Sequence, residues 1–242
     1  MGINFYEKII KRIIDIGGAM CGLIILSPLM FFVAALIRFD SKGPAIFKSP
    51  RVGRYKNVFN CYKFRTMVID APCAVATRKI DADRYITRIG RIIRKLSLDE
   101  IPQLFNILKG EMSFIGYRPV VVTEKELNFY RDARNIFIHR PGLTGLAQIS
   151  GRDNLIDMDI KAKIDGAYCN NITFFNDCSI FFATIAYVLG KKDIVEGKID
   201  TVTKFEPPVI KKQEVIIIAP NKKDSSVIAY DEALDNEKDI GA

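Results

Sequence analysis

Residues 16–37 read IGGAMCGLIILSPLMFFVAALI, an apolar stretch that holds no charged residue and has Ser27 and Pro28 near its middle. At about 1.5 Å per residue, a straight helix of this length would just cross a bilayer core of about 30 Å. Pro28 lacks a backbone donor and crowds the preceding turn, so we expect the helix to kink near Ser27. The stretch therefore predicts contact with a membrane, either as one span or as a hairpin.

The basic residues around this stretch indicate how the chain meets the membrane. They stand on both sides of it, at Lys8, Lys11 and Arg12 before it and at Arg38, Lys42, Lys48, Arg51 and Arg54 after it. Because positive residues favour the cytoplasmic side, a re-entrant hairpin that enters and leaves by one face suits both ends. We predict this monotopic arrangement, and a single anchoring span that tolerates its proline is the alternative.

The composition narrows the class of protein. The 242 residues suffice for one domain of ordinary size and a tail. The formal net charge of +8 suits nucleic acid, anionic lipid headgroups or phosphorylated substrates. His139 is the one histidine, so a histidine-based zinc site or a Ser-His-Asp triad is hard to build, although His139 alone could act as a base. The five cysteines form no C-x-x-C pair, which fits a reducing compartment.

The remaining patterns predict an α+β, mainly helical fold with a small antiparallel β element. Two short strands are expected at 45–47 and 58–64, and helical spacing covers 86–96, 101–108 and 124–138. The basic amphipathic helix at 86–96 suits either a membrane surface or an ordinary solvated face.

Two further segments complete the predicted organisation. Residues 172–189 are rich in Phe and Ile and suit either an interfacial helix or a core helix. The stretch after Glu206 lacks periodicity and predicts a disordered tail. We therefore expect three parts, with a re-entrant membrane helix-break-helix at 1–40, a cytoplasmic interfacial catalytic domain at 41–205 and the tail at 206–242.

The candidate chemistry lies in Ser97-Leu98-Asp99-Glu100. Ser97 and Glu100 match a capping box, but Pro102 would then fall inside the helix at a cost of about 3 kcal/mol. With Asp99 as the N-cap, Pro102 falls in the tolerant first turn. We therefore expect both carboxylates at a helix N-terminus, which attracts phosphate through its N–H groups and its dipole.

Two adjacent carboxylates at a phosphate site imply a divalent cation, because alone they would repel the substrate. Mg²⁺ fits, since it takes one or two carboxylates together with phosphate oxygens and water. The other carboxylate is then available for nucleophilic attack on phosphorus. An Asp-Glu pair by itself is a weak signal of catalysis.

Basic and glycine-rich groups near predicted loops are candidates for phosphate binding. Arg91 and Arg94 stand just before the acidic pair, and Lys63 and Arg65 end the second predicted strand. The other candidates are Arg118, Arg140, Gly142, Gly145 and Arg152. Each could be a solvated turn residue, but their number suits a substrate with several phosphates.

Together these residues resemble the bacterial sugar transferase family, in particular its small monotopic polyprenyl-phosphate glycosyl-1-phosphate transferases. The resemblance covers about Lys11 to Gly190. Its blocks include Lys11-Arg12 with Asp15, Ser27-Pro28, Lys42-Gly43-Pro44, Lys63-Phe64-Arg65-Thr66-Met67, Arg94-x-x-Ser97-Leu98-Asp99-Glu100, Gly110-Glu111-Met112-Ser113, Arg118-Pro119, Arg140-Pro141-Gly142-x-Thr144-Gly145 and Gly151-Arg152.

The resemblance implies a re-entrant helix broken at Ser27-Pro28, with Asp99 as the nucleophile, Glu100 as the Mg²⁺ ligand and Arg94 at a phosphate. It implies transfer of a sugar-1-phosphate from a UDP-sugar to polyprenyl (undecaprenyl) phosphate through a covalent aspartyl intermediate, with release of UMP. That reaction would begin a surface glycan (exopolysaccharide, capsule, O-antigen or glycoprotein glycan) at the cytoplasmic face of the bacterial inner membrane.

Two departures from the family pattern leave the sugar open. Tyr117 stands where Pro is more frequent, and Ser49-Pro50 replaces a commoner Gln-x. Two other classes would also explain the charge, namely an anchored protein that binds anionic lipid without catalysis and a basic nucleic-acid binder. Neither requires the acidic pair, so we expect membrane lipid as a partner and no nucleic acid, and leave a homodimer open.

Overall fold

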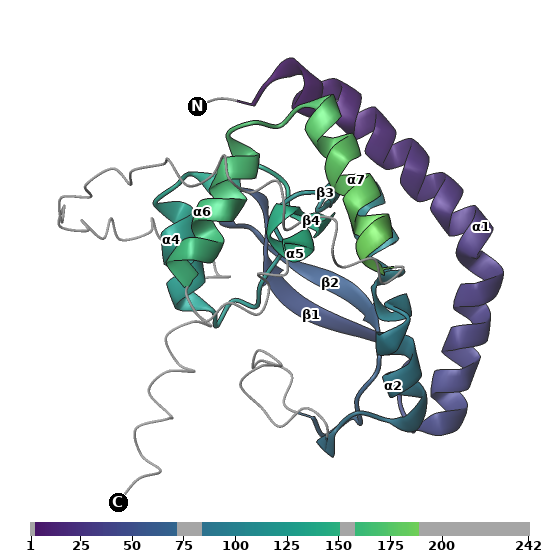
Figure 1. The fold of residues 1–242 in the computed structure, drawn as a ribbon. Helices are drawn as coiled ribbons and strands as arrows, with labels where there is room; N and C mark the ends of the chain where they lie inside the picture. Colours follow the sequence, from purple (N-terminus) through teal and green to yellow (C-terminus); the bar gives the residue numbers. More distant parts are fainter. Residues whose placement is uncertain (1–2, 72–83, 151–157, 189–242) are drawn as a thin grey trace, which may run out of the picture. The chain divides into compact units, whose positions relative to one another are not determined.

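The structure, a computed structural model, describes residues 3–71, 84–150 and 158–188 (Figure 1). A turn of π-helix at Tyr6–Ile10 precedes the long helix α1. The other helices are α2 (Arg88–Lys95), α3 (Gln103–Lys109), α4 (Lys125–Asp132), α5 (Leu146–Ile149), α6 (Met158–Cys169) and α7 (Phe174–Val188). The strands are β1 (Ile46–Val52), β2 (Val58–Phe64), β3 (Ser113–Ile115) and β4 (Gly142–Thr144). The mainly helical fold with a small antiparallel sheet is confirmed.

Helix α1 (Lys11–Asp40) contains Pro28 and continues through it without interruption, so the predicted break of the helix is wrong. Pro28 has no N–H to donate to the carbonyl of Ile24, four residues earlier. The hydroxyl of Ser27 donates to that carbonyl instead, at 2.9 Å. Because this side chain replaces the lost donor, the helix continues past the proline along a curved path (Figure 1).

The antiparallel pair of β1 and β2 confirms the predicted β element. Its register places Phe47 opposite Lys63 and Val52 opposite Val58. The tight connection at Arg54–Lys56 has Tyr55 and Lys56 at positive φ. Strand β1 is longer than predicted, because every residue from Ile46 to Val52 has a partner on β2.

A second sheet, the parallel pair of β3 and β4, was not predicted. Each strand has three residues, too few to produce an alternating pattern in the sequence. Gly116 and Gly142 allow the two segments to approach closely, since a Cβ on Gly142 would lie 2.1 Å from the backbone nitrogen of Gly116. The amide of Ser113 donates to the carbonyl of Pro141 at 2.9 Å.

The ends of the predicted helices have local causes. Thr87 caps α2 by accepting from the amide of Gly90 at 3.0 Å, and α3 ends at Gly110 with φ of 85°. The helix predicted at 124–138 is shorter, because α4 gives way to Asn135 at a φ of 54° and a short 3₁₀ turn.

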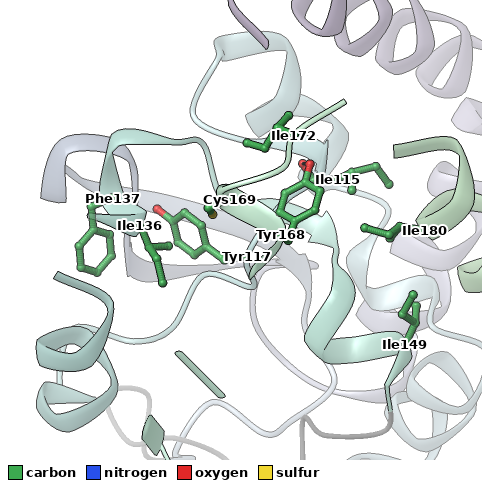
Figure 2. Packing of buried hydrophobic residues seen from close by; sticks show 9 residues of the cluster. All are labelled: Ile115, Tyr117, Ile136, Phe137, Ile149, Tyr168, Cys169, Ile172 and Ile180. Carbon is green, nitrogen blue, oxygen red and sulfur yellow. Dashed lines mark hydrogen bonds between the residues drawn. The ribbon is translucent and has the colours of Figure 1, made fainter. Parts of the chain in front are cut away.

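Two apolar groups of side chains define the inside and the outside of the fold. Figure 2 shows a buried cluster made of Ile115, Tyr117, Ile136, Phe137, Ile149, Tyr168, Cys169, Ile172 and Ile180. On the outside, large side chains of α1 and α7 are exposed, among them Ile25 at 73%, Phe31 at 78% and Phe175 at 82%. By length and composition, the helical stretch Tyr6–Asp40 is suited to cross a membrane, and 11% of its most apolar window is buried. Helix α7 thus has a buried side at Ile180 and an exposed one.

Candidate active site

A cavity of about 1460 Å³ lies among α1, the β1–β2 hairpin, the turn before α3, and α7. Its polar wall includes Lys63, Arg94, Asp99, Glu100 and Arg118, which the structure brings together from four segments of the chain. Apolar side chains of α1 and α7, such as Leu26, Phe181 and Ile185, line other parts of it. The cavity therefore combines a charged region with an apolar one.

The acidic pair sits in a 3₁₀ turn, Leu98–Glu100, which follows Ser97 at a φ of 55°. Pro102 occupies the N-cap position of α3, where its missing N–H and fixed φ do no harm. The prediction that Asp99 caps the helix is therefore wrong. Asp99 and Glu100 are fixed by the turn before the helix, and Ser97 makes no side-chain capping bond there.

Glu100 is held by two cations. Its Oε1 accepts from Lys63 Nζ at 2.8 Å and from Arg118 NH2 at 2.7 Å. Burial, the largest influence, would raise the pKa of Glu100, but the charges and hydrogen bonds of Arg118 and Lys63 outweigh it. The pKa of Glu100 therefore lies well below its ordinary value, and Glu100 is ionised at neutral pH.

Asp99 is less tightly paired than its neighbour. Its Oδ2 lies 3.8 Å from Lys63 Nζ, and its side chain is 17% exposed. Burial is the main cause that raises the pKa of Asp99 above its ordinary value of 3.8, while Lys63 lowers it and Glu100 raises it further. The Asp99 carboxylate thus faces the cavity with fewer direct contacts than Glu100, as a nucleophile requires.

Two arginines that also line the cavity, Arg94 and Arg65, make different contacts. Arg94 lines the cavity, and its Nε donates to Thr66 Oγ1 at 2.8 Å, which orients the guanidinium. Arg65 also lines the cavity, but its guanidinium donates to the backbone carbonyl of Ser41 at 2.8 Å and to that of Lys42. Arg65 therefore secures the connection that follows α1.

Four of the other predicted phosphate contacts, namely Arg91, Arg140, Gly142 and Gly145, do not line the cavity. Arg91 is exposed on α2, and Arg140 Nε donates to the carbonyl of Gly110 at 3.0 Å. Gly142 and Gly145 lie against Gly116, where a Cβ on Gly145 would come within 1.9 Å of the Gly116 carbonyl oxygen. In the structure these glycines serve close backbone packing. Arg152 lies outside the described residues.

The acidic pair fits a Mg²⁺ ion in its donor chemistry. Among the described residues, no cluster of three or more His, Cys, Asp or Glu side chains is placed to hold a metal by itself. The two adjacent carboxylates at a cavity wall nevertheless suit Mg²⁺, which usually takes one or two carboxylates and completes its shell with phosphate oxygens and water. The depressed pKa of Glu100 keeps that carboxylate in the ionised form that a metal needs.

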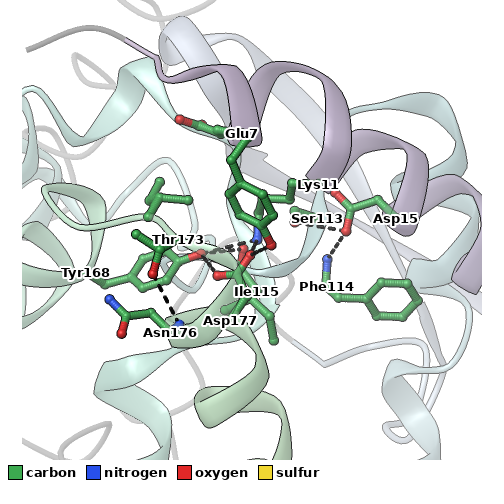
Figure 3. Close-up of polar contacts among 12 residues, drawn as sticks. Glu7, Lys11, Asp15, Ser113, Phe114, Ile115, Tyr168, Thr173, Asn176 and Asp177 are labelled. Atoms are coloured by element: carbon green, nitrogen blue, oxygen red, sulfur yellow. Dashed lines mark hydrogen bonds and ion pairs between the residues drawn. The ribbon is translucent and has the colours of Figure 1, made fainter.

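A second polar cluster borders the same cavity and was missed by sequence reasoning (Figure 3). Lys11 at the start of α1 pairs with Asp177 of α7, and both are buried. Asp177 also accepts from Tyr168 at 2.6 Å and from Tyr6 at 2.9 Å. The signal in the sequence was a carboxylate inside the Phe-rich segment 172–189, which has to find a cation when the segment folds. This cluster joins α1 to α7.

The structure thus combines a long apolar helix, whose length and composition suit a membrane, with a cavity that carries several cations and two carboxylates. The family model for bacterial sugar transferases matches residues 6–191. The chain belongs to this family, as the resemblance predicted.

Curated relatives support the assignment. The chain is 42% identical over 200 residues to the undecaprenyl-phosphate galactose phosphotransferase of Salmonella typhimurium, and this alignment covers 76% of this chain and 41% of that protein. It is 40% identical over 194 residues to the exopolysaccharide production protein ExoY of Rhizobium meliloti, and this alignment covers 74% of this chain and 84% of that protein. A third relative is the UDP-N-acetylgalactosamine-undecaprenyl-phosphate N-acetylgalactosaminephosphotransferase of Aeromonas hydrophila, 40% identical over 187 residues, or 74% of this chain and 44% of that protein. The chain thus spans about two fifths of the length of several relatives that it matches.

Proposed function

We propose that this chain transfers a sugar-1-phosphate from a UDP-sugar to polyprenyl phosphate and releases UMP, the first step of a surface glycan. The observation that carries the proposal is the placement of Asp99 and Glu100, with Lys63, Arg94 and Arg118, in a cavity that apolar side chains of α1 and α7 also line. The cations suit a nucleoside diphosphate and a lipid phosphate, and the apolar part suits an isoprenoid chain. The name of the Aeromonas relative contains both a UDP-sugar and undecaprenyl phosphate, and that of the Salmonella relative contains undecaprenyl phosphate.

The reaction that suits this geometry has two displacements. In the first, a carboxylate oxygen of Asp99 attacks the phosphorus that carries the sugar, and the bond from that phosphorus to the bridging oxygen breaks. UMP leaves with the bridging oxygen and its electron pair, and the sugar phosphate is bound to Asp99 as an acyl phosphate. In the second, an oxygen of polyprenyl phosphate attacks the same phosphorus and the Asp99 carboxylate is released.

The other residues would lower the barrier by electrostatics. Lys63, Arg94 and Arg118 would stabilise the charge that builds on the phosphoryl oxygens. Glu100, with Asp99 beside it, would hold the Mg²⁺ ion. When bound, that ion supplies charge neutralisation of the diphosphate and polarisation of the phosphorus.

The proposed placement is monotopic, at the cytoplasmic face of the inner membrane, and the contacts at both ends of α1 support the part of it that keeps both ends on one face. Near its start, Arg12 donates to the carbonyls of Ile107 and Leu108 in α3, at 2.6 and 2.9 Å. At its end, Asp40 accepts from the amide of Ile89 in α2, at 3.1 Å. A helix that crosses a bilayer separates its ends by about 30 Å of hydrocarbon. Because the same domain holds both ends of α1, a placement of the curved helix with both ends on one face suits it better than a span.

The experiment that tests the function uses the full chain purified in detergent, Mg²⁺, a panel of UDP-sugars and undecaprenyl phosphate. We expect release of UMP with at least one UDP-sugar, and we expect it to depend on the lipid phosphate for continued turnover. If no UDP-sugar yields UMP while the protein still binds anionic vesicles, the non-catalytic lipid-binding function is the better assignment.

A further inference from the structure

An ion pair outside the cavity is almost completely buried. The side chains of Arg131 in α4 and Asp165 in α6 are 0% and 2% exposed. Asp165 Oδ2 accepts from Arg131 Nε at 2.9 Å and from Arg131 NH2 at 2.6 Å. Burying two charges costs free energy that the pairing itself hardly recovers, so such a pair is weak evidence for stability alone. What else the guanidinium contacts is therefore of interest.

The remaining terminal nitrogen of Arg131 reaches the segment that carries Arg118. Arg131 NH1 donates to the backbone carbonyl of Arg118 at 3.0 Å. The same guanidinium lies 5.0 Å from the ring centroid of Tyr117, the preceding residue. Tyr117 is itself fixed in the buried cluster of Figure 2, edge-on to Phe137 at 5.9 Å. The buried side chain of Arg131 thus contacts both Tyr117 and Arg118.

Three successive carbonyls of this segment are held by other elements. Besides the Arg118 carbonyl, that of Pro119 accepts from Arg51 NH1 at 3.2 Å, and that of Val120 accepts from the amide of Val52 at 3.1 Å. Arg51 and Val52 belong to β1, so the hairpin and α4 fix the segment together. From it the Arg118 side chain extends to Glu100 Oε1, at 2.7 Å.

We propose that Arg131, held by Asp165, is a positioning residue that sets the direction of Arg118 toward Glu100. The inference rests on the proposed function in so far as Arg118 and Glu100 act in sugar-phosphate transfer. The guanidinium is needed because its planar fork bonds the carboxylate and the carbonyl at once, which a single ammonium group at the end of a Lys side chain does less well. Asp165 holds the fork in the orientation in which NH1 points at the Arg118 carbonyl.

The test variant is Arg131→Lys, which keeps a positive charge beside Asp165. Its matched control is Arg134→Lys. Arg134 also bonds a backbone carbonyl, that of Tyr130 at 2.9 Å, and a carboxylate of α6, that of Asp159 at 2.5 Å. The two changes remove the same kind of fork next to the same helices, but only the first touches the Arg118 segment.

The measurement is a double-mutant cycle with Arg118→Gln, which keeps the Arg118 carbonyl but removes its guanidinium. We expect Arg131→Lys to lower kcat for UMP release about tenfold with little change in KM for the UDP-sugar, and Arg134→Lys to leave both unchanged. In the Arg118→Gln background, Arg131→Lys should cause no further loss. The same variants are compared by thermal unfolding. The shifts of the unfolding midpoint caused by Arg131→Lys and Arg118→Gln should be non-additive, whereas those caused by Arg134→Lys and Arg118→Gln should be additive.

The outcomes separate the inference from the proposed function. The positioning role would be overturned if Arg131→Lys and Arg118→Gln lowered kcat by factors that multiply in the double variant, or if their shifts of the unfolding midpoint were additive. If the parent protein releases no UMP, the proposed function fails, and the unfolding cycle alone then decides the inference. Should Arg131→Lys not fold, Tyr117→Leu takes its place, since it removes the ring beneath the guanidinium and should also be non-additive with Arg118→Gln.

Discussion

At the scale of single residues, Asp99 and Glu100 differ in their surroundings although they are neighbours in the chain. Glu100 accepts from Lys63 and Arg118, and Asp99 has Lys63 at 3.8 Å. Two carboxylates whose environments separate their pKa values in this way are suited to different tasks. In the proposed mechanism, this pairing would leave Asp99 available for attack and keep Glu100 ionised for a metal.

The nucleophile prediction follows from this difference. Asp99→Asn keeps the shape of the side chain but removes the attacking charge, so turnover should fall by at least about a thousandfold. Glu100→Gln should weaken the dependence of turnover on Mg²⁺. Incubation of the parent with labelled UDP-sugar and Mg²⁺, without lipid, should leave label on the peptide that contains Asp99. Asp132→Asn, a change at an exposed carboxylate paired with Lys56, is the control. Near-parent turnover of Asp99→Asn without any adduct would favour direct transfer in one step.

A second prediction at this scale concerns pH and Asp159. Burial would raise the pKa of Asp159, but hydrogen bonds and charge from Lys163 and Arg134 lower it below the ordinary value of 3.8. A depressed pKa contributes stability above the unfolded pKa, and this contribution is lost as pH falls through the folded pKa. Because the side chain is 30% exposed, Asp159→Asn should cost less than about 1 kcal/mol at pH 7. Unfolding midpoints of parent and variant should converge below the ordinary pKa of 3.8. A gap between the two midpoints that stays constant well below that pH would contradict the assignment.

At the scale of elements, one contact joins two strands and another lies within α1. The parallel pairing of β3 and β4 depends on backbones that approach at Gly116 and Gly142. The curved α1 depends on the Ser27 hydroxyl, which occupies the carbonyl that Pro28 leaves without a partner. The first contact is tested by a substitution at Gly142, and the path of α1 is tested by a substitution at Pro28.

Gly142→Ala tests whether that glycine serves packing or phosphate. A Cβ there would lie 2.1 Å from the Gly116 backbone nitrogen, so we expect a loss of stability of about 3 kcal/mol or more. Gly17→Ala is the matched control, because nothing lies within 4 Å of a Cβ at that position of α1, and helix propensity makes the change neutral or stabilising. Thermal unfolding of the two variants gives the comparison. A stable Gly142→Ala variant with a raised KM for the UDP-sugar would instead assign the glycine to the substrate.

The topology of α1 is tested by cysteine labelling. Single cysteines at Phe5, which is 68% exposed, and at Lys42 are placed in a background without the native cysteines. If both ends of α1 face the cytoplasm, an impermeant thiol reagent should label neither site from outside intact spheroplasts and both sites after lysis. Pro28→Leu restores the backbone donor and should straighten the helix, which favours a full span and separates the two sites. Labelling of one site from outside in the parent would contradict the monotopic placement.

At the scale of the whole molecule, the match to the family ends at residue 191, and every residue named in the proposed mechanism precedes it. We therefore predict that a chain ending near Pro207 keeps its turnover in detergent. UMP release by the shortened and full chains is compared at equal concentrations, with vesicle flotation as a control for membrane binding. A large loss of activity with folding and flotation intact would assign the tail to the site.

The sequence alone determined the features that rest on neighbouring residues. The apolar stretch at 16–37 predicted a helix there, turn residues before Val58 predicted the start of β2, and Lys109-Gly110 predicted the end of α3. These predictions succeeded because the signals for helices and strands come from residues that are close together in the chain. The Asp-Glu pair was visible for the same reason.

Only the tertiary structure decided which charges meet. Lys11 pairs with Asp177 across 166 positions, and Arg131 pairs with Asp165 while bonding the Arg118 carbonyl. Arg140 and Gly142, which the sequence suggested as phosphate contacts, lie against backbone in the structure. Local patterns cannot distinguish these roles, because an arginine or a glycine in a loop has the same neighbours in the chain whether it serves a substrate or a buried carbonyl. Long-range packing sets that difference, since it alone decides which buried polar group needs a partner.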